Sequence, residues 1–77
     1  MKVYCIYDRV AQEGGPLFCA KNEAVAVRNY NNLLSSSNVD NVSDYSLYCL
    51  GEYDSEQPSL FGDKVPTLMN TSEDYNA

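Results

Sequence analysis

Tyrosine side chains interleaved with cations are the residues of this chain best suited to chemistry. The 77 residues include seven Tyr, two Phe and no Trp. Because side chains alternate along a strand, Tyr4 and Tyr48 can both lie on one face of a β-sheet, and Lys2 shares that face. A base can stack on such a ring while a cation pairs with phosphate, as in proteins that bind single-stranded nucleic acid. The candidate nucleic-acid-binding residues are Lys2, Tyr4, Lys21, Arg28 and Tyr48.

The same tyrosines allow a second interpretation, in which the Tyr-rich face is buried between copies of the chain. Tyr is favoured at protein interfaces because its ring is apolar while its hydroxyl can stay wet. A homodimer or higher homo-oligomer would then account for these residues without nucleic acid. Both interpretations stay open from the residues alone.

Catalysis is not expected from this sequence. The chain lacks His, the usual general base, and the Gly-Gly-Pro at residues 14–16 fits a turn and not a phosphate-binding loop. The acids Asp8, Glu52 and Asp54 could meet at strand ends, but exposed acids at such positions are usually only solvated. We therefore expect no enzyme, with no catalytic residue, no metal site and no cofactor.

Charge is unevenly distributed along the chain, which carries 5 cationic and 11 acidic side chains for a net charge of −6. Residues 1–34 carry four cations against three acids, whereas residues 35–77 carry Lys64 alone against eight acids. An anion-binding surface must therefore come from the first half of the chain. The acidic half would oppose it within a Debye length of about 8–10 Å.

The cysteine count bears on the compartment in which the protein works. Three cysteines, an odd number, and the lack of a signal peptide indicate free thiols in a reducing compartment. No apolar run approaches the length of a membrane span. We expect a soluble, cytoplasmic protein with no membrane partner.

Two segments are predicted to form the centre of a sheet. Residues 2–8 and 44–54 are apolar on both sides when extended, so we expect two adjacent central strands. Gly51 marks a bulge or a close backbone approach in the second of them. Residues 17–20 return after a turn as a short strand and complete a hairpin with the first.

An amphipathic helix is predicted after Asn22, which can cap it, and the helix should end near Ser35. The spacing of its apolar residues is typical of one buried helical face. That face would consist of Ala26, Val27, Tyr30, Leu33 and Leu34.

The predicted fold is α+β, a small antiparallel sheet of three or four strands in the order β-β-α-β, with one helix packed on one face. Residues 1–58 would form a compact domain, and residues 59–77 a short extension ending in a disordered acidic tail from Asn70 onward. A helix of about 13 residues is about 20 Å long and covers only one face. The second face therefore needs a partner subunit, or cover from the segment after Pro58.

Four segments resemble, in consistent order and spacing, the small nonstructural protein of gokushoviruses, the tailless single-stranded DNA phages of the microvirus family. They are M-K-V-Y-C-I-Y-D at residues 1–8, G-P-L-F-x-A-K-N at 15–22, A-V-R at 26–28 and D-Y-S-L-Y-C-L-G-E-Y-D at 44–54. The similarity covers residues 1 to about 56, and the segment after Pro58 departs from it.

The resemblance implies a nonstructural phage protein in the cytoplasm of the infected bacterial host, acting in genome replication and packaging. Single-stranded DNA is the expected partner, bound through the Tyr-bearing sheet face. The alternative is an acidic adaptor that recruits the phage replication initiator, a host replication protein or capsid proteins without touching DNA.

Overall fold

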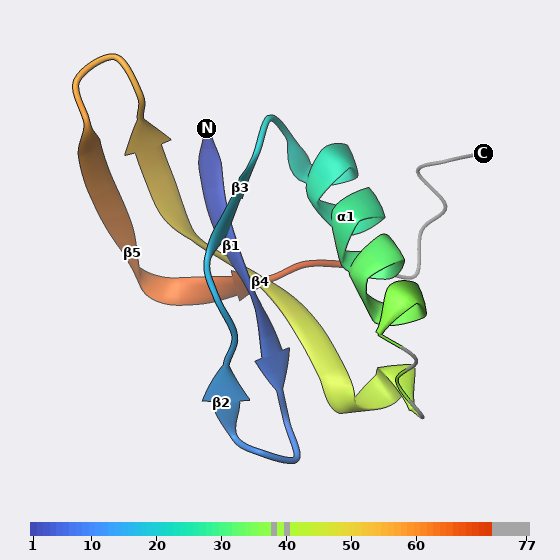
Figure 1. Ribbon diagram of the computed structural model, residues 1–77. Coiled ribbons are helices and arrows are strands. Elements are labelled where there is room, and N and C mark those ends of the chain that lie inside the picture. The colour runs from blue at the N-terminus through green and yellow to red at the C-terminus, as the bar shows by residue number, and fades with distance from the viewer. Residues whose placement is uncertain (38, 40, 72–77) are drawn as a thin grey trace.

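The computed structural model describes residues 1–37, 39 and 41–71, and in it the chain folds into one curled antiparallel sheet with a helix packed against it (Figure 1). The helix α1 comprises Glu23–Ser36, and a short 3-10 helix η1 comprises Val42–Asp44. The strands are β1 (Lys2–Asp8), β2 (Glu13–Gly14), β3 (Phe18–Ala20), β4 (Tyr45–Asp54) and β5 (Ser59–Leu68).

The centre of the sheet is the pair β1 and β4. β2 and β3 both pair with the other side of β1, and β5 pairs with the outer side of β4. In the β1–β4 pair, Tyr4 lies opposite Cys49 and Asp8 lies opposite Tyr45. The prediction that these two strands are neighbours is confirmed, and their apolar character on both faces is the physical reason.

The predicted fold class, with three or four strands in the order β-β-α-β, is wrong. Over residues 1–37, 39 and 41–71 the sheet has five strands, of which three precede α1 and two long ones follow it. The sequence predicts only a turn at residues 13–14, where β2 forms, and after Pro58 only short apolar runs, divided by Gly62 and Pro66, that could add an edge strand. Local propensity argues against a strand containing both residues, whereas pairing with β4 accommodates them.

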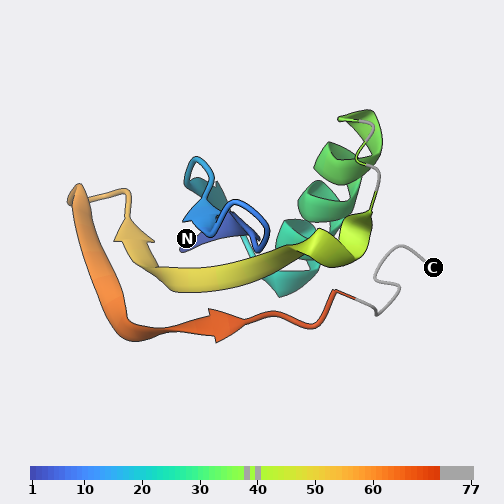
Figure 2. The same cartoon turned by 90° about the horizontal axis from the view of Figure 1, so that it is seen from below.

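A bulge explains how β5 tolerates its glycine and proline. Gly62 lies opposite Gly51 and Thr67 lies opposite Cys49, so residues 63–66 bulge opposite Leu50. Pro66 falls inside this bulge, where a missing backbone N–H costs no ladder hydrogen bond. Figure 2 shows β5 bending sharply along its length, on the opposite side of β4 from α1.

The close backbone approach expected at Gly51 is confirmed. A Cβ on Gly51 would collide with the carbonyl oxygen of Phe61 on β5. Gly62, which faces Gly51 across the strand pair, has open space where its Cβ would be. Packing therefore requires a glycine at position 51 but not at position 62.

The helix follows its sequence signals closely. The Asn22 side chain accepts a hydrogen bond of 2.9 Å from the backbone N–H of Val25, which satisfies one of the free donors at the start of α1. The helix ends at Ser36, one residue beyond the expected end. Leu33, expected on the buried face, is 47% exposed and belongs to the solvent side. The other predicted members of the buried face are confirmed, namely Ala26, Val27, Tyr30 and Leu34.

The hydrophobic core lies between α1 and the sheet face that α1 covers. Tyr4 is buried there and stacks on Phe18 of β3, with ring centroids 5.8 Å apart. Leu47 of β4 is fully buried in the same core as the buried residues of α1. The core consists of Tyr4, Ala20, Ala26, Val27, Tyr30, Leu34, Leu47 and Cys49.

The chain after β5 crosses back toward the helix. The backbone N–H of Met69 donates to the carbonyl oxygen of Leu47, and the Thr71 side chain hydrogen-bonds to Tyr30. Of the expected disordered tail, residues 72–77 lie outside the described residues. The division of the chain at residue 58 stays a prediction.

Candidate binding surfaces

The two tyrosines chosen from the sequence lie on opposite faces of the sheet. Tyr4 is opposite Cys49 in the antiparallel β1–β4 pair, and Tyr48 is opposite Cys5. Directly opposed residues share a face, and neighbours along a strand point to opposite faces. The expectation that Tyr4 and Tyr48 share a face is therefore wrong. Alternation of side chains within each strand does not fix how the two strands are aligned with one another.

Tyr4 itself is unavailable for stacking on a base. Its side chain is 2% exposed, in contact with the core beneath α1. Burial raises the pKa of the Tyr4 hydroxyl, and the nearby Cys49, Glu23 and Glu52 raise it further by smaller amounts. Tyr4 thus acts as a core residue.

The predicted cations do not gather around Tyr48. Lys2 pairs with Glu52, with Nζ 3.5 Å from Oε1, and the N-terminal amine lies 3.4 Å from the other oxygen of that carboxylate. Lys21 precedes the helix cap, and Arg28 is exposed on α1, which packs on the face opposite Tyr48. The described structure therefore does not assemble the predicted set into one site, and whether any member binds nucleic acid stays a prediction.

An apolar hollow of about 490 Å³ lies on the sheet face that α1 leaves uncovered. We call it the second-face hollow, and its lining comes from β1, β4 and β5. In it the rings of Tyr7 and Tyr48 meet edge to face, with centroids 6.0 Å apart and planes at 90°. The lining residues are Cys5, Tyr7, Tyr48, Leu50, Val65 and Pro66.

Among the described residues that line the second-face hollow, none is charged and none is a reactive thiolate. Burial raises the pKa of the Cys5 thiol, so this side chain stays neutral at neutral pH. Tyr48 was singled out from the sequence, but its aromatic neighbour Tyr7 was not. Tyr7 could have been found only from the β1–β4 register, which places it opposite Ser46, on the same face as Tyr48.

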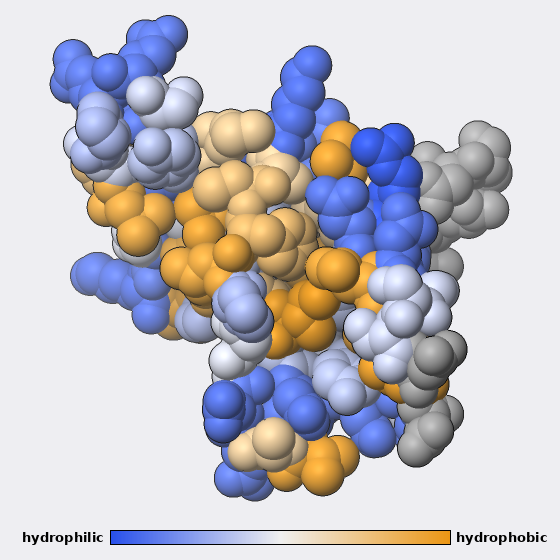
Figure 3. Space-filling model, in the orientation of Figure 1, coloured by the Kyte–Doolittle hydropathy of each residue, from blue (hydrophilic) through white to orange (hydrophobic). Residues whose placement is uncertain are grey.

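Apolar surface continues from the hollow along β5. Every residue of this strand is exposed, and four large apolar side chains on it are between 61% and 74% exposed. These are Leu60, Phe61, Val65 and Leu68. Figure 3 shows apolar surface over β1 and β3 in the middle of the visible face and, at the left, beside the start of β5 below the hydrophilic tip of the β4–β5 hairpin. Contiguous exposed apolar surface usually marks an interaction site.

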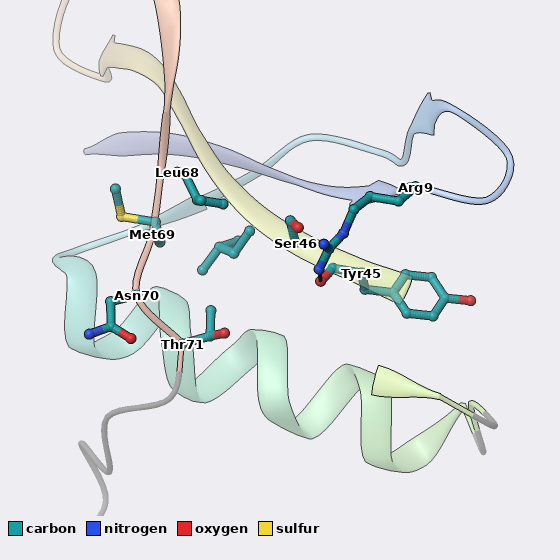
Figure 4. A pocket seen from close by; sticks show the side chains of 8 residues that line it. Arg9, Tyr45, Ser46, Leu68, Met69, Asn70 and Thr71 are labelled. Atoms are coloured by element: carbon teal, nitrogen blue, oxygen red, sulfur yellow. Dashed lines mark hydrogen bonds between the residues drawn. The ribbon is translucent and has the colours of Figure 1, made fainter. Parts of the chain in front are cut away.

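A second, more polar groove runs between α1, the start of β4 and the chain after β5. It consists of two hollows of about 430 and 500 Å³ that share Arg9, Tyr45 and Thr71, and we call it the Arg9 groove. Figure 4 shows Arg9 reaching across the start of β4, with Thr71 on the far side of the hollow. The guanidinium donates to the carbonyl oxygen of Tyr45 at 3.2 Å.

Arg9 is the one charged residue among the described residues that line this groove. Burial raises the pKa of Tyr30 in its wall, and the charge of Arg9 and the hydrogen bond to Thr71 partly oppose that rise. A single cation can hold one carboxylate or phosphate. It cannot follow the backbone of a nucleic acid, which needs several cations in a row.

Neither a metal site nor a membrane span is found in the described part of the chain. Its Cys, Asp and Glu residues form no group of three that could hold an ion. The three cysteines, Cys5, Cys19 and Cys49, are free thiols. The helices described are too short or too polar to cross a bilayer.

Comparison with known proteins identifies the family of the chain. The family model described as Phage ORF5 protein matches residues 1–75 of the 77 residues. No curated protein and no solved structure shows significant similarity to the chain.

Proposed function

Because the chain belongs to the Phage ORF5 protein family, we propose that it is a nonstructural accessory protein that works as a protein adaptor during phage genome replication and packaging in the host cytoplasm. The second-face hollow is the surface that binds the partner. The partner is a replication initiator, a host replication protein or a capsid protein. The similarity of residues 1–56 to the gokushovirus protein supports this setting.

The observation that carries the proposal is the chemistry of the second-face hollow. Two tyrosine rings, Leu50, Val65 and Pro66 surround it, and none of the described residues that line it is a cation. An apolar side chain of a partner protein fits such a lining, and aromatic residues at the centre of an interface often dominate its binding energy. A phosphate backbone finds no counter-charge there.

Charge also favours a protein partner over a nucleic acid. The net charge is −6, and Lys2, the predicted cation nearest to Tyr4 in sequence, is paired with Glu52. At most 5 cations per chain can meet phosphates. With a slope of about −0.7 per phosphate, log K for single-stranded DNA can fall no more steeply than about −3.5 per decade of salt.

Single-stranded DNA is the second candidate ligand, and the geometry of Tyr7 and Tyr48 favours it. Both rings are only partly buried, and their edge-to-face arrangement leaves ring surface open to the hollow. Stacking on an aromatic ring is worth about 1–3 kcal/mol per base and needs no particular sequence. DNA binding would then depend on Tyr48 and only weakly on salt.

One pair of variants distinguishes the two functions. Tyr48→Ser removes a ring from the hollow, and Tyr53→Ser is the matched control, because Tyr53 is also partly buried on β4 but lies outside the hollow. Each purified variant is titrated with a labelled oligonucleotide at about 20 mM salt, and with the purified replication initiator and capsid protein of the same phage.

The adaptor function predicts that Tyr48→Ser weakens binding to one of these proteins at least about tenfold, a loss of about 1.4 kcal/mol, while Tyr53→Ser does not. The DNA function predicts the same contrast for the oligonucleotide, with an unchanged salt slope. If both variants bind every ligand like the parent, the second-face hollow is not the functional surface.

A further inference from the structure

We propose that β5 is the contact surface between two copies of this chain, which meet about a two-fold axis near residues 63 and 64. This inference goes beyond the adaptor function, because it concerns the assembly that carries the second-face hollow. It rests on the exposure, position and charge of β5.

Exposure is the first reason. β5 has β4 on one side and no strand of the described chain on the other. Its ten residues are all exposed, including Leu60, Phe61 and Leu68 at 61% each. Leaving three such side chains in water on one strand is unfavourable, and burial against a partner would relieve this cost.

The charges on β5 identify the partner as a second copy. Two copies with a net charge of −6 each repel one another, so they can meet only where the local charge is balanced. Lys64 is the one cation in residues 35–77, and it lies directly beside Asp63. Neither side chain forms an ion pair with another described residue.

A two-fold axis makes these charges self-complementary. In such a contact, residue i of one copy meets residue j of the other, and j meets i. With the axis between residues 63 and 64, Asp63 of each copy meets Lys64 of the second copy, so that two ion pairs form. The same geometry brings Leu60 of one copy toward residues 67 and 68 of the other, which adds apolar contact.

Side chains, and not a continuous hydrogen-bond ladder, would join the two strands. Pro66 has no N–H to donate, and the bulge at residues 63–66 interrupts the strand. Edge strands protected in this way resist open-ended pairing. The contact therefore closes as a dimer, and an open chain of subunits is not expected.

Charge reversal tests this geometry in solution. We expect the parent protein to sediment as a dimer at micromolar concentration, and Asp63→Lys and Lys64→Asp each to weaken dimerisation at least tenfold through like-charge contacts. Mixing these two variants should restore the dimer, because each then offers the other two opposite charges. A parent that sediments as a monomer of 8.6 kDa, or variants that stay apart when mixed, would overturn the proposal.

An apolar substitution provides an independent check with a matched control. Leu60 and Val42 are both 61% exposed, but only Leu60 lies on β5. Leu60→Ser should shift the sedimentation toward monomer, while Val42→Ser should not. Equal behaviour of the two variants would contradict a contact through β5. The titration of Tyr48→Ser with the replication initiator and the capsid protein tests the adaptor function separately.

Discussion

The carbonyl oxygen of Phe61 occupies the space that a Cβ on Gly51 would need. This approach of β5 to β4 occurs at the bulge, where the register between the two strands changes. Gly51 is therefore the residue that allows the long hairpin of β4 and β5 to close.

Replacing this glycine should destabilise the protein. In Gly51→Ala, the methyl group forces two backbones apart, and overpacking of this kind costs about 1–3 kcal/mol. Gly62→Ala is the control, because its methyl group enters open space on the facing strand. Urea unfolding followed by circular dichroism measures both variants. Equal midpoints would show that the two strands do not approach as described.

Adjacent leucines on α1 should differ strongly in their contribution to stability. Leu34 is 7% exposed and Leu33 is 47% exposed. Leu34→Ala should cost about 2–5 kcal/mol through lost burial and the cavity left behind, and Leu33→Ala less than about 1 kcal/mol. The free energy of unfolding of each variant measures the difference. A larger loss for Leu33→Ala would mean that the helix packs through another face.

Alkaline pH should destabilise the fold through Tyr4 and Tyr30. Burial is the main cause that raises the pKa of each hydroxyl in the folded protein, whereas in the unfolded chain both titrate near about 10. Their stabilising contribution is complete below that pH and is lost as pH rises toward the folded-state pKa values. Unfolding midpoints between about pH 8 and 11 measure this loss. Tyr4→Phe should flatten the alkaline decline, and an unchanged decline would exclude Tyr4 as its source.

Ending the chain at Pro58 should weaken the sheet. The shortened chain loses the pairing of β5 with β4, the hydrogen bond from Met69 to Leu47 and the one between Thr71 and Tyr30. We therefore expect it to unfold at a lower urea concentration than the full chain. Unchanged stability would instead establish residues 1–58 as a self-sufficient domain, as the sequence suggests.

Sequence alone was sufficient wherever the deciding interactions are local. The cap at Asn22, the buried residues Ala26, Val27 and Tyr30, and the close approach at Gly51 all follow from helical periodicity or from the steric properties of one residue. The cap and the helix face depend on neighbours within a few positions along the chain, so a pattern of residue types predicts them. At Gly51 the missing side chain alone signals a close approach, although the backbone it meets, at Phe61, belongs to another strand.

Tertiary structure decided the candidate surfaces, because they depend on how separate strands are aligned. Within β1 and within β4, Tyr4 and Tyr48 look equivalent, but the register between the strands places Tyr4 in the core and Tyr48 beside Tyr7. A shift of one residue would reverse this arrangement. Likewise, Pro66 forbids a regular strand locally, and only pairing of β5 with β4 through a bulge accommodates it. Register and bulges are set by contacts between residues far apart in the sequence, which no local pattern contains.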